Sequence, residues 1–132
     1  MIVVDCSFVL DLLVRPSSVG DVDASQEWCA PELLAVEVAS GVRGLLLGGE
    51  VDDAVARQLI RDFHDLGIRL WPTDPDMQER ILDLAHNVTA HDAAYVVLAE
   101  ALDAPLVTHD CRLAAAAAGI IRVLVDGPRP SG

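Results

Sequence analysis

The amino-acid sequence predicts a three-layer α/β sandwich on a mainly parallel sheet, and three observations lead to this fold class. Short runs rich in apolar and β-branched residues recur at positions 2–4, 68–71, 106–108 and 120–125. Longer segments with the apolar spacing of helices separate these runs. The first run, Ile2-Val3-Val4, is apolar throughout, which is typical of a strand covered by helices on both faces. Strands that alternate with helices in this way form parallel sheets with helices on either side.

Length and composition indicate one soluble domain. The chain has 132 residues, 52% of them hydrophobic, which suits a globular protein with a single core. We expect residues 1–126 to form this domain and residues 127–132, Gly-Pro-Arg-Pro-Ser-Gly, to form a tail. Asp5 and Asp11 interrupt the apolar start, and no run approaches the ~20 apolar residues of a membrane-spanning helix. These features predict a cytoplasmic protein without a membrane partner.

Carboxylates mark element boundaries in the first half of the chain. The first strand ends at Asp5, and apolar residues at helical spacing follow it until Arg15-Pro16 stops the helix. Residues 16–29 are polar and predict a loop. Ala30-Pro31-Glu32 then predicts a helix with proline in its first turn, and Glu37 is the one charge inside its apolar stretch.

The second half continues the alternation of helices and strands. We expect, in order, an amphipathic helix over 51–66, a strand over 68–71, a helix from Thr73 or Asp74 to 84–86, a buried helix after Asp92, a strand at 106–108, an Ala-rich helix from Asp110 to Gly119 and a final strand at 120–125.

The charge of the chain limits the ways in which it can bind nucleic acid. Twenty-one acids face nine bases, the formal net charge is −12, and the nine bases are all arginine. This balance argues against a general nucleic-acid-binding surface, whose affinity comes from cations that meet phosphates. It does not exclude a phosphodiester substrate bridged by a metal ion, because carboxylates that hold such an ion are counted in the formal charge.

Four acids stand at strand ends, at a helix start or on an otherwise apolar helix face: Asp5, Glu37, Asp92 and Asp110. A simpler interpretation exists for two of them, because Thr89 with Asp92 forms a capping-box pattern and Asp110 is an acceptable helix cap. The carboxyl ends of parallel strands are nevertheless where open α/β sheets bind ligands. If the four acids meet there, each close pair costs about 4 kcal/mol at an effective dielectric of ~20, so something must neutralise them.

A divalent cation is the neutralising partner that these residues suit best. An all-oxygen site without converging His or Cys favours Mg²⁺, with Mn²⁺ as the alternative. Such a site lends itself to phosphodiester hydrolysis, because a bound metal lowers the pKa of water and stabilises the leaving oxygen. In this interpretation the four acids are the catalytic metal ligands, and the hydroxyls of Ser7 and Thr108 lie behind them and orient them.

The histidines and cysteines are expected to play no part in metal binding. His91 and His109 precede acids, and we interpret them as exposed loop residues. Cys6, Cys29 and Cys111 are odd in number and lack CxxC spacing, which predicts free, mostly buried thiols.

Other small α/β classes fit less well. A phosphoacceptor receiver domain needs a lysine to hold the phosphoryl group, and the chain has none. A dinucleotide-binding domain needs GxGxxG and a P-loop NTPase needs GxxxxGK[ST], and neither motif is present.

Four motifs, taken in order, carry a family resemblance. They are Ile2-Val3-Val4-Asp5-Cys6-Ser7; Pro31-Glu32-Leu33-Leu34 with Glu37-Val38; Thr89-Ala90-His91-Asp92-Ala93-Ala94-Tyr95 with Leu98-Ala99-Glu100; and Leu106-Val107-Thr108-His109-Asp110 with Arg112-Leu113-Ala114. Each motif is weak alone, and the four in this order are specific. The chain resembles PIN-domain ribonucleases, and in particular VapC-type toxins of VapBC toxin–antitoxin pairs, over nearly all of its length.

The resemblance implies a fold, an activity and partners. It implies a PIN-like sheet, Mg²⁺-dependent endonucleolytic cleavage of RNA, homodimerisation, and a hetero-oligomer with a cognate antitoxin whose segment lies across the acidic site. The chain departs from the family pattern at residues 16–30, which are short and polar where members usually carry another helix, and at Asp103, where a glycine is common. The shortened region keeps open an alternative function, a catalytically weak PIN-like module that acts mainly by binding its antitoxin. With no lysine in the chain, we predict Arg15, Arg43 and Arg112 as the RNA contacts.

Overall fold

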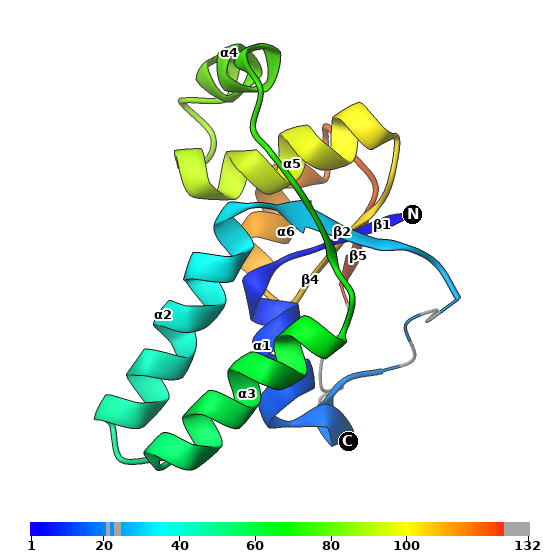
Figure 1. Ribbon diagram of the computed structural model, residues 1–132. Helices are drawn as coiled ribbons and strands as arrows, with labels where there is room; N and C mark the ends of the chain where they lie inside the picture. The colour runs from blue at the N-terminus through cyan, green and yellow to red at the C-terminus, as the bar shows by residue number, and fades with distance from the viewer. Residues whose placement is uncertain (21, 23–24, 126–132) are drawn as a thin grey trace.

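The computed structural model of the chain describes residues 1–20, 22 and 25–125 (Figure 1). The tail predicted for residues 127–132 lies outside this described part. Five strands form one sheet in the order β3-β2-β1-β4-β5, and all four pairings are parallel. The strands are β1 (Ile2–Val4), β2 (Trp28–Pro31), β3 (Arg69–Trp71), β4 (Leu106–Thr108) and β5 (Val123–Val125). The predicted α/β fold class with a parallel sheet is therefore confirmed.

Helices cover the sheet on both faces. They are α1 (Cys6–Val14), α2 (Leu33–Leu47), α3 (Asp53–Asp65), α4 (Pro75–Asp83), α5 (Ala90–Leu102) and α6 (Cys111–Ala117), with a 3₁₀ turn, η1, at Pro16–Ser18. Helices α1, α2 and α3 pack against one another on one side, and α4, α5 and α6 gather on the other (Figure 1). This division follows from right-handed crossovers, which change face when the chain changes its direction along the sheet.

The centre of the sheet and one helix make up most of the core. Seven consecutive residues of α5, Ala93 to Ala99, are buried, and α5 lies across β1, β2 and β4. All three residues of β1 and of β4 are also buried. The apolar runs after Asp92 and before Asp5 are thus covered on most sides, as predicted. None of the described helices is both long and apolar enough to cross a bilayer.

Acidic and hydroxyl side chains cap the helices that the sequence predicts. Asp5 accepts from the backbone N–H of Phe8 at the start of α1, and Asp74 accepts from Met77 ahead of Pro75 in α4. At the end of α5 the cap is Asp103, with φ of +50°. Aspartate is one of the few non-glycine residues that adopt this left-handed conformation, so the residue can stand where the family usually has glycine.

The prediction for residues 28–31 was wrong. Ala30 and Pro31 belong to β2 and do not open a helix, which begins at Leu33. Cys29 is fully buried and pairs with Val3 on one side and Arg69 on the other. The strand was missed because it is short, contains alanine and ends on proline. Pro31 is tolerated there because it is the last residue of the strand and its missing N–H is not needed for further pairing.

Candidate active site

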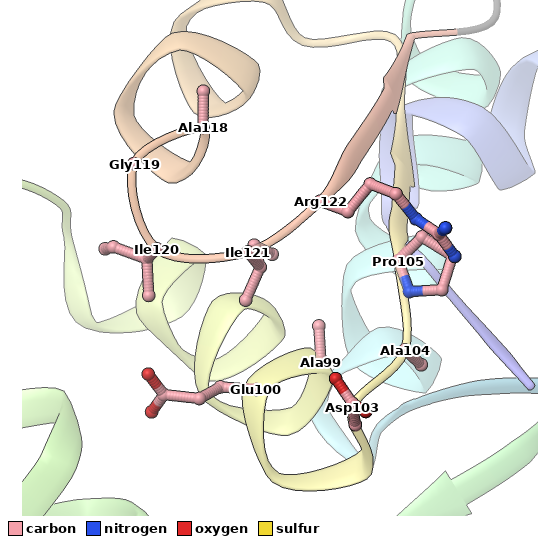
Figure 2. Close-up of a pocket in the computed structure, with 10 residues that line it drawn as sticks. All are labelled: Ala99, Glu100, Asp103, Ala104, Pro105, Ala118, Gly119, Ile120, Ile121 and Arg122. Carbon is pink, nitrogen blue, oxygen red and sulfur yellow. The ribbon is translucent and has the colours of Figure 1, made fainter.

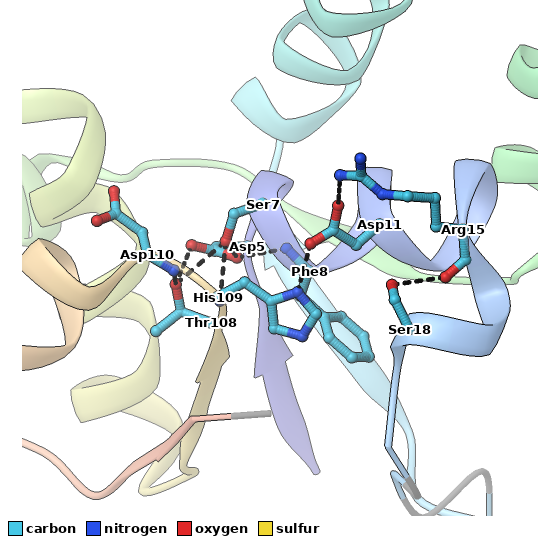
Figure 3. A network of polar contacts seen from close by, with 9 residues as sticks. All are labelled: Asp5, Ser7, Phe8, Asp11, Arg15, Ser18, Thr108, His109 and Asp110. Carbon is cyan, nitrogen blue, oxygen red and sulfur yellow. Dashed lines mark hydrogen bonds and ion pairs between the residues drawn. The ribbon is translucent and has the colours of Figure 1, made fainter. Parts of the chain in front are cut away.

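Asp5 lies at the carboxyl end of the central strand, where β1 passes into α1. One of its oxygens accepts from the N–H of Phe8 at 3.0 Å and from the hydroxyl of Ser7 at 2.7 Å, and the other accepts from the hydroxyl of Thr108 at 2.5 Å (Figure 3). The residue is only 4% exposed. Burial raises the pKa of Asp5, the three hydrogen bonds lower it in part, and the nearby charge of Asp110 raises it again.

Thr108 joins the two central strands at the level of Asp5. It is the last residue of β4 and is fully buried. While its hydroxyl donates to Asp5, the same oxygen accepts from the backbone N–H of Asp110 at 3.0 Å. The hydroxyl of Ser7 likewise accepts from the N–H of His109 at 2.9 Å. The two predicted hydroxyls therefore fix the loop after β4 to the start of α1, which is the orienting geometry expected of them.

Asp110 caps the start of α6, and its charge raises the pKa of Asp5. Its Oδ1 accepts from the N–H groups of Arg112 at 2.9 Å and Leu113 at 3.3 Å at the start of α6. Its other oxygen, Oδ2, makes no hydrogen bond within the described chain. The cap interpretation and the metal-ligand interpretation of Asp110 are thus compatible, because each uses a different oxygen.

Glu37 and Tyr95 connect α2 to α5. Glu37 is half-buried, and its Oε1 accepts from the phenol of Tyr95, which is 2% exposed, at 2.5 Å. Burial raises the pKa of Glu37; the Tyr95 hydrogen bond and the charge of His91 lower it, and the charges of Asp92 and Asp5 raise it. Among the described residues Glu37 forms no ion pair with arginine, and it lies close enough to Asp92 and Asp5 for their charges to act on it.

Asp92 lies in the first turn of α5 and is half-buried. Its backbone N–H donates to the Thr89 hydroxyl at 3.2 Å, which is the capping pattern expected from the sequence. Its carboxylate makes no hydrogen bond or ion pair within the described chain. Asp92 is thus held by its backbone, and its side chain remains available to a ligand.

The four carboxylates suit a divalent cation chemically. All the donors are oxygen, and within the described residues Asp92, Asp110 and Glu37 each keep at least one oxygen without a hydrogen bond. The described residues nevertheless include no group of three or more His, Cys, Asp or Glu side chains that converges closely enough to hold a metal ion. The site is therefore a set of neighbouring acids and not a closed cage.

The prediction that His109 is an exposed loop residue was wrong. Its side chain is only 6% exposed, and its Nδ1 lies 2.6 Å from Oδ2 of Asp11 (Figure 3). Phe8 packs edge-on against the imidazole, with 5.4 Å between ring centroids. Asp11 is in turn paired with Arg15 at 2.7 Å. The sequence analysis did not predict these contacts. The available signal was Asp11, an acid six residues after Asp5 within a mostly apolar helix.

His91 differs from the prediction in a smaller way. It is exposed as expected, but it belongs to the first turn of α5 and not to a loop. The three cysteines are free; Cys29 is buried, Cys6 is half-buried and Cys111 is exposed. Burial, followed by the charges of Glu37 and Asp5, raises the pKa of the Cys6 thiol to about 12, so it stays neutral beside the acids.

The three predicted RNA-contacting arginines lie at different places. Arg112 is in the first turn of α6, with a side chain that is 91% exposed and an Nε that lies 3.9 Å from Asp110. Arg43 is exposed on α2, six residues after Glu37. Arg15 caps the far end of α1 and is held by Asp11. Arg112 is thus the one that directly adjoins a predicted ligand.

None of the four acids lines the cavity of about 500 Å³ that Figure 2 shows. Its lining includes Asp103 at the end of α5, Pro105 before β4 and Arg122 before β5. These residues mark the amino ends of the strands, whereas open parallel sheets bind their ligands at the carboxyl ends. The acidic site at the carboxyl ends is therefore the better candidate for the active site.

Comparison with known proteins identifies the class to which this fold and site belong. The PIN-domain family model matches residues 2–119, so the chain belongs to the PIN-domain family. Ribonuclease VapC9 of Mycobacterium tuberculosis is 36% identical over 113 residues, which cover 86% of this chain and 88% of VapC9. Curated relatives of this chain thus include ribonucleases of the VapC group, and enzymes of this group generally depend on a divalent metal.

Solved structures agree on the fold. The crystal structure of PAE2754 from Pyrobaculum aerophilum matches with a TM-score of 0.70 at 23% identity, over 91% of this chain and 81% of that one. VapC20 of Mycobacterium tuberculosis, described as a sarcin–ricin loop cleaving toxin, matches with a TM-score of 0.64 at 17% identity, over 95% of this chain and all of the other. The PIN-like architecture expected from the resemblance is confirmed.

Proposed function

We propose that this chain is a metal-dependent endoribonuclease, the toxin of a VapBC-type toxin–antitoxin pair. In this proposal Asp5, Glu37, Asp92 and Asp110 hold Mg²⁺, with Mn²⁺ as a substitute, at the carboxyl edge of the sheet. The observation that carries the proposal is the proximity of these acids: the charge of Asp110 raises the pKa of Asp5, and the charges of Asp92 and Asp5 raise the pKa of Glu37. Membership of the PIN-domain family and the VapC ribonucleases among its relatives support it.

The donor set supports Mg²⁺ in particular. Carboxylate oxygens are hard ligands, and Mg²⁺ takes one or two of them together with water and substrate phosphate oxygens. A site of neighbouring acids that is not a closed cage suits this mode of binding. A bound divalent cation supplies a water molecule of lowered pKa and stabilises charge on the leaving oxygen.

Each acid has a role that its surroundings favour. Asp5, which accepts three hydrogen bonds, provides the fixed point, and Thr108 and Ser7 keep its carboxylate in place. Asp92 and Asp110 bind the metal ion through carboxylate oxygens that make no hydrogen bond within the described chain. Glu37 is the acid best suited to accept the proton of the attacking water, because burial raises its pKa and the Tyr95 phenol leaves Oε2 free.

The partners and compartment follow from the proposed activity. The substrate is RNA, and Arg112, Arg43 and Arg15 are candidates for phosphate contacts in decreasing order of proximity to the predicted ligands. A cognate antitoxin would form a hetero-oligomer with the chain and cover the acids, and the toxin itself would be a homodimer in the cytoplasm. We infer these assemblies from the family resemblance.

The test is RNA cleavage by purified protein freed of antitoxin, with total RNA and Mg²⁺. We expect cleavage by the wild-type protein, loss of cleavage in excess EDTA, and recovery when Mg²⁺ or Mn²⁺ is added back. Asp92→Asn should lose cleavage. Asp76→Asn is a matched control, because Asp76 occupies the first turn of α4 as Asp92 occupies the first turn of α5, and it should cleave like wild type.

One result would replace this proposal by the alternative of a catalytically weak binding module. If wild type, Asp92→Asn and Asp76→Asn show the same residual cleavage with and without metal, the acids do not serve hydrolysis. Tight antitoxin binding by all three proteins would then identify the chain as a binding module.

A further inference from the structure

A second pocket adjoins the acidic site between α2, α4 and α5. It has a volume of about 340 Å³, and its apolar wall is formed by Leu33 of α2, Ile81 of α4, and Ala90 and Ala94 of α5. The two alanines leave room above the surface of α5. The pocket therefore offers an apolar wall to a ligand of modest size.

The rim of this pocket is polar. The Thr73 hydroxyl, the Gln78 amide and the His91 imidazole line it. Within the described chain none of these three side chains makes a hydrogen bond, so their donors and acceptors are available. An apolar wall with a rim that both donates and accepts matches a planar heteroaromatic ring with polar edges.

The pocket lies within reach of the proposed metal ligands. Leu33 precedes Glu37 by four residues on α2, which places the two on the same helix face, about one turn apart. Ala90 and His91 directly precede Asp92, and His91 is close enough to Glu37 for its charge to act on that carboxylate. A nucleotide whose phosphate is at the acids can therefore reach the pocket with its own base or that of its neighbour.

The chain has few basic side chains that can bind phosphate, so a contact between the pocket and a base would help it to select its RNA substrate. Of the nine arginines, Arg15, Arg57, Arg69, Arg80 and Arg112 are already engaged in ion pairs with acids of the same chain. Phosphate contacts position an RNA but do not read its sequence, and few cations remain to make them. Contacts with a base provide affinity and selectivity that do not depend on positive charge.

We propose that the pocket lined by Leu33, Thr73, Gln78, Ile81, Ala90, His91 and Ala94 binds one nucleobase next to the cleaved phosphodiester. The base packs against the apolar wall and the His91 ring, and Gln78 and Thr73 contact its polar edge. This proposal rests on the RNA-cleaving function above and adds to it the determinant of sequence preference.

The first test measures base preference with an RNA pool randomised around one cleavage site. Wild type should favour particular bases at one position flanking the cut. Ala90→Leu, which fills the pocket from an exposed position, and Gln78→Ala should each reduce that preference about tenfold, by lowering kcat/KM for the preferred RNA while cleavage of other RNAs changes little. Ala101→Leu, an exposed alanine on the same helix outside the pocket, should keep the wild-type preference.

Three outcomes would overturn the proposal. Unchanged preference in both pocket variants, with wild-type thermal stability, means that the pocket does not read a base. An equal loss of cleavage for all sequences in both pocket variants means that these residues support cleavage in general and do not select a base. Loss of antitoxin binding with unchanged base preference assigns the pocket to a protein side chain.

A second measurement separates this proposal from the proposed function. The backbone amide signals of Gln78, His91 and Ala94 are followed by NMR during titration with each of the four nucleoside 5′-monophosphates, with inorganic phosphate as the control. The proposal expects shifts with at least one nucleotide, none with phosphate, and none in Ala90→Leu, even if the wild-type protein fails to cleave RNA. Absence of shifts with all four nucleotides would overturn the base-binding proposal while leaving RNA cleavage untouched.

Discussion

Asp5 caps the start of α1 and Asp92 lies in the first turn of α5, and the protein holds the two acids in different ways. Asp5 belongs to the β1–β4 half, with Ser7, Thr108 and Asp110, and its carboxylate accepts three hydrogen bonds in the core. Asp92 belongs to the α2–α5 half, with Glu37 and Tyr95. Its carboxylate has no such partner in the described chain, and one phenol holds Glu37.

The difference separates a fixed half from an adjustable half. Buried carboxylates are costly, and hydrogen bonds offset that cost while they fix the geometry. The β1–β4 half is therefore ordered before any ligand arrives. The α2–α5 half has free oxygens, and a bound ion or phosphate can determine where they settle. Four predictions test this division, from the largest expected effect to the smallest.

Asp5→Asn should remove the fixed point of the site. We expect RNA cleavage to fall by more than about 100-fold, beyond the 10–100-fold typical of groups that only orient a metal ligand. Mn²⁺ at 100 times its Kd should stabilise the wild-type protein by about 2.7 kcal/mol, and it should not stabilise the variant at the same concentration. Equal stabilisation of both proteins in thermal unfolding would show that Asp5 is not a ligand.

Thr108→Val keeps the shape of the side chain and removes the hydroxyl that links Asp5 to the backbone of Asp110. Cleavage should fall about 10–100-fold, and the free energy of unfolding should drop by about 1–3 kcal/mol because buried polar groups lose their partner. Val42→Ala, a core substitution on α2 away from Asp5, serves as the control for destabilisation. If this control loses cleavage as strongly as Thr108→Val, the effect of Thr108 is one of general stability.

Tyr95→Phe tests the adjustable half. The Tyr95 hydrogen bond lowers the pKa of Glu37, so its removal should raise that pKa further. Cleavage should fall only a few-fold at pH 7.5 and more strongly at pH 5.5, where more of Glu37 is protonated in the variant. A pH profile parallel to that of wild type would contradict the link between the phenol and the ionisation of Glu37.

Glu37 and Glu100 should change the free energy of unfolding with pH in opposite directions, because the pKa of Glu37 is raised and that of Glu100 is lowered in the folded protein. Burial raises the pKa of Glu37 in the folded protein above the ordinary 4.5, so the folded state retains a proton that the unfolded chain has released. The ionisation of Glu37 therefore lowers the free energy of unfolding as the pH rises from 4.5 through the raised pKa of the folded protein, and the loss remains at neutral pH. Metal-free Glu37→Gln should therefore gain stability relative to wild type between pH 4 and pH 7.

Glu100→Gln is the matched control. The Arg80 hydrogen bond lowers the pKa of Glu100, so its contribution is present above 4.5 and is lost as the pH falls. Relative to wild type, this variant should lose stability between pH 4 and pH 7. Urea unfolding at both pH values measures the two differences, and the same sign for both variants would refute the assignment of Glu37 as a desolvated acid.

The sequence predicted the fold class and the places of the acids because both depend on local signals. Asp5 and Asp110 follow apolar strands, and Asp92 opens an apolar helix, so strand ends and helix starts located them. The strand at Trp28–Pro31 was not predicted because it is short and ends on proline, and because its place in the sheet depends on pairing with the distant strands β1 and β3.

Contacts between distant segments were beyond the reach of sequence patterns. The Tyr95–Glu37 bond joins residues 58 positions apart, and its existence depends on how α5 crosses the sheet. His109 was misjudged for the same reason, because its burial arises from Asp11 and Phe8 on a helix 98 or more residues earlier. Helix caps and apolar periods report neighbours along the chain, and these contacts arise from the tertiary packing.

The bond between Thr108 and Asp5 has a consequence for the order of events during synthesis. The two residues are 103 positions apart, and they meet only when the fourth strand to be synthesised pairs with the first. Pairing over such a separation is a late step of folding, because a long loop must close before the contact forms. A growing chain that has not yet released residues 106–110 from the ribosome therefore lacks the bond that orders Asp5, and with it the ordered half of its site.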